Sequence, residues 1–277
     1  MRDAHVSRID YLLITHMHED HNGGAAELAR RVPIGVFVDY GELMETSPDQ
    51  VASFTAYRAA REHAVEAGTS RHVIPKPGDP LPLDGVDVRV LSVDGESVST
   101  PMAGAGQPNT VCTAYEARPF ASRENPRSIG IHLRFGKFRL LDLGDLVGPN
   151  LLRLVCPDNL IGDIDAYVIT HHANADTNVA PLLGAIRPRV AIADNGAYKG
   201  GSPPTWAALR ERMEIEGVWQ LHKSLNYESV NFPDAFIANL EFGDADRGSW
   251  IKLSASDDGS FSVTNGRTGW TEHYKKK

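Results

Sequence analysis

The length, composition and charge of the chain exclude several classes of protein. It has 277 residues, of which 42% are hydrophobic, so it can bury a substantial core. No stretch approaches the roughly 20 apolar residues of a membrane span. A net charge of −8 argues against a surface that coats nucleic acid, although a nuclease can concentrate positive charge in one groove.

The cysteines and the first residues bear on the cellular compartment. Cys112 and Cys156 are too few for a disulfide framework and leave either one disulfide or none. Residues 1–5 do not form a signal peptide, so we expect the chain as it stands to be cytoplasmic. If an N-terminal segment is missing, export is the alternative.

The first predicted element is a buried strand at residues 11–14, and a motif rich in metal ligands follows it. Four metal-competent side chains lie within six residues: His16, His18, Asp20 and His21. Imidazoles two residues apart share a side of an extended backbone. Nitrogen and carboxylate donors together suit zinc, with manganese or iron as weaker candidates. The alternative interpretation is a solvated loop rich in histidine.

The next elements continue a strand, loop, helix, strand order. A helix is predicted at 25–31 and a strand at 34–38, separated by Pro33. A second amphipathic helix at 51–67 and a half-buried strand at 86–93 follow. Residues 94–110 then show no hydrophobic periodicity. We interpret this stretch either as a lid or binding loop or as a mobile insertion.

A predicted hairpin leads to a second candidate ligand. Its strands are expected at 129–135 and 138–143, joined by a tight turn. Asp145 follows directly after the second strand and Gly144. Asp142 is the rival carboxylate, at the end of the strand itself.

Part of the chain repeats. Residues 164–171 match residues 9–16 at five of eight positions, at an offset of 155. A predicted helix at 180–186 and strand at 188–193 echo the helix and strand that follow the first copy. We therefore predict a single domain, 1–277, of two pseudo-repeated halves, about 1–125 and 126–277.

The repeat chooses between two adjacent histidines. His171 aligns with His16 at the end of its strand, so we predict His171 as a metal ligand. In an extended backbone the next side chain points elsewhere, which leaves His172 to support the ligands or to face the substrate. Three further histidines are predicted to pack or to face solvent: His63, His132 and His222.

The last third of the chain adds one candidate contact for substrate. Tyr198 and Lys199 lie in a loop rich in glycine and proline, where they could contact an anionic or carbonyl oxygen or belong to a solvated turn. The remaining predicted elements are a helix and a closing β-hairpin, at 205–216, 250–254 and 260–265.

The motif at residues 15–24 resembles the signature of the metallo-β-lactamase fold superfamily. The resemblance implies an α/β fold, an αββα sandwich of two similar halves, with the N-terminal strands that usually precede the motif missing here. It implies a binuclear site in which His16 and His18 serve one metal while Asp20 and His21 serve the other. Asp145 would bridge the two.

Later motifs resemble a particular branch of this superfamily. The order of Asn125, Ser128, the hairpin, Gly144-Asp145 and His171-His172 is similar to the ComEC-type metallo-hydrolase domain of DNA-uptake proteins and its free-standing relatives. In that branch the third histidine of the first metal is absent, so that metal is expected to bind weakly.

The resemblance implies a metal-dependent hydrolase that uses a metal-activated hydroxide. We predict catalytic roles for Asp20 and His172. A phosphodiester, either a small molecule or a nucleic acid, is the favoured substrate. The alternatives are a lactonase, thioesterase or β-lactamase-like acyl hydrolase, and a degenerate metal-binding module without activity. A homo-oligomer is also compatible with the sequence.

Overall fold

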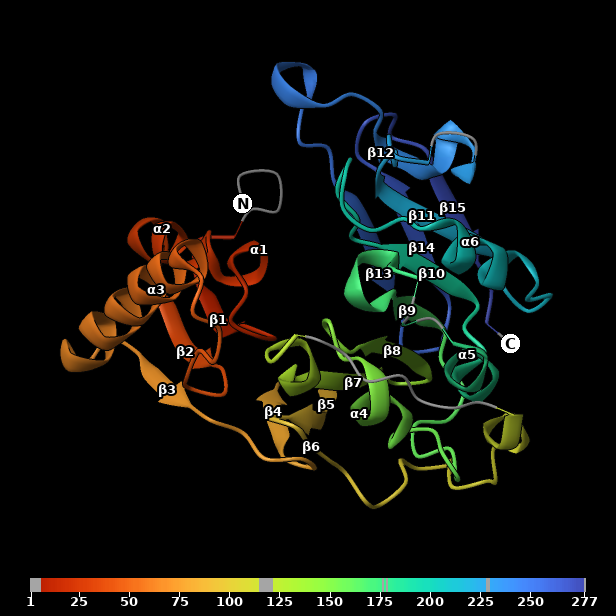
Figure 1. Ribbon diagram of the computed structural model, residues 1–277, viewed down its shortest axis with the longest axis horizontal. Coiled ribbons are helices and arrows are strands. Elements are labelled where there is room, and N and C mark those ends of the chain that lie inside the picture. Colours follow the sequence, from red (N-terminus) through yellow and green to blue (C-terminus); the bar gives the residue numbers. More distant parts are fainter. Residues whose placement is uncertain (1–5, 115–121, 176, 178, 228–229, 277) are drawn as a thin grey trace.

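Four layers of helix and sheet make up the computed structural model (Figure 1). The structure describes residues 6–114, 122–175, 177, 179–227 and 230–276. Two sheets lie at the centre, and helices cover their outer faces. This is a mixed α/β fold consistent with a metallo-β-lactamase sandwich, which confirms the predicted fold class.

The first sheet is small and wholly parallel. Its order is β1 (Ile9–Leu13), β2 (Ile34–Val38) and β3 (Arg71–Val73). Helices α1 (Glu19–Asn22) and α2 (Ala25–Arg31) connect β1 to β2. Helix α3 (Pro48–Glu66) connects β2 to β3 and begins three residues before its predicted start. Phe54 and Tyr57 of α3 are buried in one cluster with Phe37 of β2, so α3 covers the outer face of this sheet.

The second sheet carries the rest of the central structure. Its order is β12-β11-β10-β9-β8-β7-β5-β4, and β6 pairs with the end of β5. Strands β8 to β12 run parallel to their neighbours, whereas β4, β5, β7 and β8 pair antiparallel. The bounds are β4 Pro80–Leu83, β5 Val86–Val93, β6 Glu96–Ser97, β7 Gly130–Phe135, β8 Phe138–Asp142, β9 Ala166–Val168, β10 Val190–Ala193, β11 Gly217–His222 and β12 Ile237–Asn239.

The predicted hairpin is confirmed as β7 and β8, but the sequence did not indicate β11 and β12. Strands from both sides of residue 125 share the second sheet, because β5 pairs with β7. The two halves therefore interlock, and the organisation of the whole chain as one domain stays a prediction.

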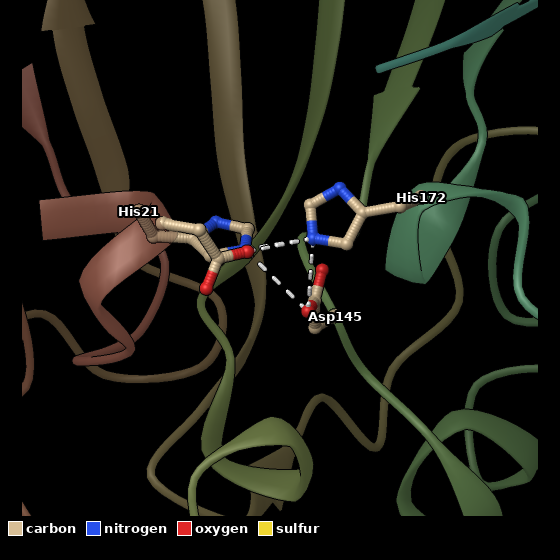
Figure 2. Close-up of side chains that lie close together, drawn as sticks. His21, Asp145 and His172 are labelled. Carbon is tan, nitrogen blue, oxygen red and sulfur yellow. Dashed lines mark hydrogen bonds and ion pairs between the residues drawn. The ribbon is translucent and has the colours of Figure 1, made fainter. Parts of the chain in front are cut away.

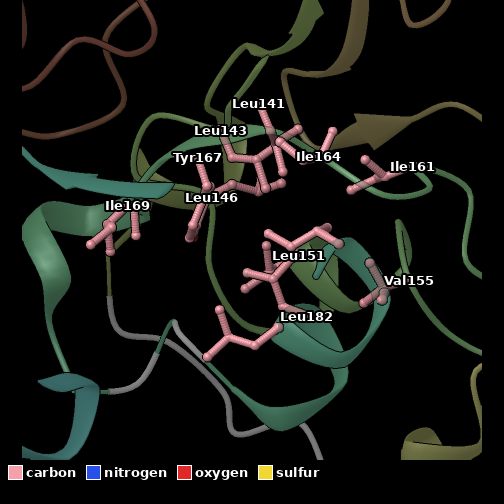
Figure 3. Packing of buried hydrophobic residues seen from close by; sticks show 14 of the residues in the cluster. Leu141, Leu143, Leu146, Leu151, Val155, Ile161, Ile164, Tyr167, Ile169 and Leu182 are labelled. Atoms are coloured by element: carbon pink, nitrogen blue, oxygen red, sulfur yellow. The ribbon is translucent and has the colours of Figure 1, made fainter. Parts of the chain in front are cut away.

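Three helices cover the outer face of the second sheet: α4 (Gly148–Leu152), α5 (Ala180–Ile186) and α6 (Pro203–Arg210). Figure 3 shows Leu151 of α4 and Leu182 of α5 packed in one cluster with Leu141 of β8. Helix α6 ends six residues before its predicted end. This cluster is the largest buried core described, and it fixes the strands that lead to the site.

A third sheet, near the C-terminus, packs against the second sheet on the face opposite the three helices. It contains the predicted hairpin, β13 (Ile251–Ala255) and β14 (Phe261–Asn265), and one further strand, β15 (Thr271–Tyr274). Phe261 of this sheet is buried in one cluster with Trp219 of β11. The third sheet thus supports the strands β8 to β11.

The internal repeat is confirmed as two β-α-β units. The helices α2 and α5 begin and end at positions that differ by the same offset of 155 residues. In each unit the two flanking strands pair in parallel, β1 with β2 and β9 with β10. The repeat in sequence is therefore a repeat of a supersecondary unit.

The stretch without periodicity after β5 is mostly irregular up to the 3₁₀ helix η1 (Thr110–Ala114). A disulfide between Cys112 and Cys156, with a Cα–Cα distance of 5.8 Å, fastens η1 to the segment after α4. The structure thus decides between the two cysteine states left open above. Among the described helices, none combines the length and apolar composition needed to cross a bilayer.

Candidate metal centre

The candidate site lies where the carboxyl ends of strands from both sheets meet. After β1 the chain leaves the sheet at Thr15 and buries His16 completely. His18 occupies the N-cap position of α1, a four-residue helix that carries Asp20 and His21. A side chain at Gly23 would lie 2.5 Å from the carbonyl oxygen of Glu19, so only glycine allows this tight turn.

One cluster of ligand atoms joins this loop to the second sheet. It contains Asp20, His21, Asp145 and His172, with one ligand atom from each, all within 4.8 Å of one another. Nε2 of His172 lies 3.0 Å from Oδ2 of Asp20 and 3.4 Å from Oδ2 of Asp145. Figure 2 shows His21 and His172 facing one another from opposite sides, with Asp145 below the ring of His172. A divalent ion would fit among these four groups.

A second cluster shares Asp145. It contains His16, His18 and Asp145. Nε2 of His16 lies 3.0 Å from Nδ1 of His18 and 3.6 Å from Oδ2 of Asp145. The structure therefore places one buried carboxylate at both clusters, the position expected for a bridging ligand. Asp142, the rival carboxylate, lies outside both clusters and accepts a hydrogen bond from the N–H of Gly144.

The structure brings together every predicted ligand except His171. Its Nε2 atom lies 3.1 Å from Nδ2 of Asn125 and 3.9 Å from Oδ2 of Asp145, whereas His172 enters the first cluster. The expectation of an extended backbone here is wrong. His171, His172 and Ala173 all adopt left-handed conformations, with φ of 52°, 54° and 63°. Because the backbone turns at each residue, the strand-like alternation used to choose His171 does not apply.

Close backbone contacts hold this left-handed turn. The N–H groups of Gly201 and Ser202 donate to the carbonyl oxygens of His172 and Ala173. A side chain at Gly200 would lie 1.8 Å from the carbonyl oxygen of His172. Residues other than glycine rarely adopt such conformations, so the surrounding contacts must stabilise this turn.

Further polar groups orient the imidazoles. The hydroxyl of Thr15 lies 3.2 Å from Nδ1 of both His16 and His21, which leaves Nε2 of each ring facing the carboxylates. Nδ1 of His172 lies 3.3 Å from the carbonyl oxygen of Asp194, at the end of β10. Such contacts fix the ring orientation and the proton position of metal-binding histidines.

A buried carboxylate that the sequence did not reveal supports the first loop. Glu124 is fully buried and accepts hydrogen bonds from the hydroxyl of Tyr40 and the N–H of Met44. The Tyr40 hydroxyl in turn accepts a bond from the N–H of Met17, between His16 and His18. Glu124 lies at least 80 residues from these partners, so no local pattern could have indicated its role.

The electrostatics of the first cluster favour protonated histidines beside ionised carboxylates. Burial would lower the pKa of His172, but its hydrogen bonds to Asp145, Asp194 and Asp20 raise it to about 12. Burial likewise opposes Asp145 and Asp20, which raise the pKa of His21 to about 9. Conversely, the histidines hold the pKa of both carboxylates well below the usual range against the effect of burial.

One lysine reaches the cluster from the glycine-rich loop. The ammonium group of Lys199 donates a hydrogen bond to Oδ2 of Asp20, the carboxylate oxygen that also faces His21 and His172. Tyr198, its predicted companion, instead packs edge-on against Phe242. His132 and His222 stay outside both clusters, in agreement with the structural roles predicted for them.

Comparison with known families addresses the first part of the chain. Residues 2–115 match the family model described as the metallo-beta-lactamase superfamily. This stretch of the chain is therefore similar to that superfamily. The match includes the whole motif from His16 to His21 but covers less than half of the 277 residues. Comparison with curated proteins gives no significant match.

Several solved structures show a distant likeness to this chain. They include CmlA, a diiron β-hydroxylase from Streptomyces venezuelae, with 15% identity and a TM-score of 0.40, covering 76% of this chain and 39% of CmlA. The metallo-beta-lactamase fold protein YhfI from Bacillus subtilis has 7% identity and a TM-score of 0.41, covering 76% of this chain and 74% of YhfI. Zn²⁺-bound PqqB from Methylobacterium extorquens has 17% identity and a TM-score of 0.35, covering 76% of this chain and 60% of PqqB. The chain thus spans less than half the length of CmlA.

We expect metal binding to release protons. At pH 7 His21 and His172 carry protons because their pKa values are raised to about 9 and about 12, and a histidine must lose its proton to bind a metal. Metal affinity should therefore rise as the pH increases toward 9. Calorimetric titration of zinc into metal-free protein, in two buffers of different ionisation enthalpy, measures the protons released. Uptake without proton release would contradict these protonation states.

The two adjacent histidines should differ when each is replaced. We expect His172→Ala to lose the metal of the first cluster, because His172 faces Asp20 and Asp145, while His171→Ala keeps it. Elemental analysis of the purified variants measures the metal bound per chain. The opposite result would restore the choice of His171 made from the repeat.

Removing the hydroxyl of Thr15 should weaken metal binding without removing a ligand. We expect Thr15→Val to lower metal affinity about 10- to 100-fold, because the imidazoles of His16 and His21 lose the group that orients them. Thr15→Ser, which keeps a hydroxyl, is the matched control and should bind nearly as the original. Competition with a chromogenic chelator measures both, and equal losses would argue against an orienting role.

Proposed function

We propose that the chain is a metal-dependent hydrolase with a binuclear centre that cleaves phosphodiester bonds. The observation that carries this proposal is the position of Asp145, whose buried carboxylate belongs to both ligand clusters. Two clusters that share one carboxylate match the two-metal arrangement of many hydrolases of phosphate esters. The donors are imidazole and carboxylate groups, which suit zinc and also manganese or iron.

Two sets of residues would each hold one metal ion. His16 and His18 would hold one ion, and Asp20, His21 and His172 the other, with Asp145 between the two. Bound there, divalent ions would supply activation of a water molecule and stabilisation of negative charge. Thr15 and Asp194 keep the imidazole rings in place during this chemistry. The role of His172 is then that of a ligand rather than a group that faces the substrate.

The preference for an anionic substrate has one support within the site. Lys199 is half exposed and places its ammonium group at Asp20, on the rim of the first cluster. When a metal ion engages Asp20, this cation becomes available for a second partner. A phosphate oxygen of the substrate is a suitable one. The similarity to ComEC-type domains supports the diester over a monoester.

Metal content and hydrolysis should be measured together. We expect two ions per chain after zinc or manganese addition, and turnover of bis(p-nitrophenyl) phosphate by the loaded protein. His16→Ala should lose activity and one ion, whereas His63→Ala, at an exposed position on α3, should lose neither. Two ions with turnover of p-nitrophenyl acetate or a lactone alone would favour the acyl hydrolase. Failure to bind any metal would favour the degenerate module.

Lys199 should bind the negatively charged phosphate of the substrate. We expect Lys199→Met to raise KM for the anionic diester by about tenfold, the effect of one lost charged hydrogen bond, with a smaller change in kcat. Turnover of the neutral ester p-nitrophenyl acetate, if any, should not change. Steady-state kinetics on both compounds provide the measurement. An equal effect on charged and neutral compounds would mean that Lys199 acts on Asp20 rather than on substrate.

A further inference from the structure

A second cavity lies away from the metal centre and has the opposite charge. Its volume is about 460 Å³, and it opens between the outer face of the second sheet, the segment after β6 and the C-terminal end of α5. None of the metal-centre residues lines it. Four arginines do: Arg89, Arg134, Arg139 and Arg187.

The charge of this cavity runs against that of the chain. Besides the four arginines, its charged lining consists of Asp87 and Asp163. The cavity is therefore positive in a chain with a net charge of −8. Such a local excess of cations attracts anions.

The strand register places like charges face to face. Arg134 of β7 lies directly opposite Arg139 of β8. Like charges at directly opposed positions destabilise an antiparallel pair. Asp87 serves two guanidinium groups, at 3.0 Å from Nε of Arg89 and 3.4 Å from Nη2 of Arg134. Asp165 lies 3.5 Å from Nε of Arg139 but is shared with Arg189. Two carboxylates shared in this way leave an excess of positive charge at the end of the hairpin.

Two further residues of the lining, His132 and Arg187, have unusual surroundings. His132 lies opposite Arg89, and burial together with Arg139 lowers its pKa to about 4, so it adds no positive charge of its own. Arg187 ends α5 in a left-handed conformation, with φ of 42°. Glycine is the usual residue at such a helix end, so the chain carries an arginine where the backbone favours another residue.

We propose that this cavity binds a phosphate ester of a small organic molecule about the size of a nucleotide. Arginine forks bind phosphate oxygens in pairs, and the four arginines converge without any lysine. Met102, Pro108 and Ile161 give the cavity an apolar wall for the organic part. The volume lies within the range of small-molecule sites, roughly 300–1,000 Å³.

The cavity is distinct from the substrate position of the metal centre. Arg139 lies near the start of β8, and Asp145 follows the other end of this strand. At about 3.3 Å per residue, the two positions are on the order of 20 Å apart. The ligand would therefore bind in addition to the substrate, and the proposal does not depend on the proposed hydrolysis.

The experiment is a calorimetric titration of adenosine 5′-monophosphate into the full chain. We expect saturable binding of one molecule per chain, weakened by salt, that persists after a chelator has removed metal ions. Inorganic phosphate, the second probe, should bind more weakly because it cannot use the apolar wall. Failure of the metal-free chain to bind either probe would overturn the proposal. Equal affinity for both would overturn the assignment of an organic ester.

Variants locate the binding. We expect the double variant Arg134→Gln, Arg139→Gln to weaken binding at least tenfold, because two charged hydrogen bonds are lost. Its Tm without ligand should change little, because relief of the opposed charges offsets the lost ion pairs to Asp87 and Asp165. Arg58→Gln is the matched control, since Arg58 has a similar exposure and a single acidic neighbour on α3. If the double variant does not fold, Arg89→Gln replaces it, and unchanged affinity in the variant used would refute the site.

Discussion

The buried carboxylate of Asp145 is the constraint on which the rest of this structure depends. It is 2% exposed and lies within 4 Å of imidazole nitrogens from both sheets. A buried carboxylate is costly unless positive charge or hydrogen bonds compensate it. The compensating imidazoles are those of His16 and His21, which follow the first sheet, and of His172, which follows the second. Asp145 and its partners therefore link the two sheets at the site, beside the apolar cluster that Val36 of the first sheet shares with Val88 of the second.

The same constraint explains why metal ions and protons should compete at this site. Without metal, protons on His21 and His172 hold Asp20 and Asp145 together, and Lys199 adds a further cation. A divalent ion supplies the same positive charge at a single point and leaves the histidines neutral. Metal and protons thus compete for one arrangement of side chains.

The sequence predicted those features that are local and missed those that depend on long-range register. Adjacent ligands such as His16 and Asp20 follow from one motif, and the repeat indicated the β-α-β units. The extended backbone assumed in choosing His171 is wrong, because periodicity does not reveal a left-handed backbone. Glu124 was not predicted, since it acts through segments far from it in the chain. The opposed pair Arg134 and Arg139 lies in the predicted hairpin, but no repulsion between them was inferred from the sequence. Strands β11 and β12 were missed for want of a clear alternation.

Two copies of one unit have diverged to build a single site. Parallel strands place their carboxyl ends at one edge, and polar side chains that follow these ends converge there. After β1 the chain forms α1 and presents Asp20 and His21 from its first turn. At the equivalent point after β9 it makes a left-handed turn that presents His172 instead, held by Gly200 and its neighbours. A strained turn is stable only where several contacts fix it, and this one persists where a ligand from the second sheet must meet those of the first.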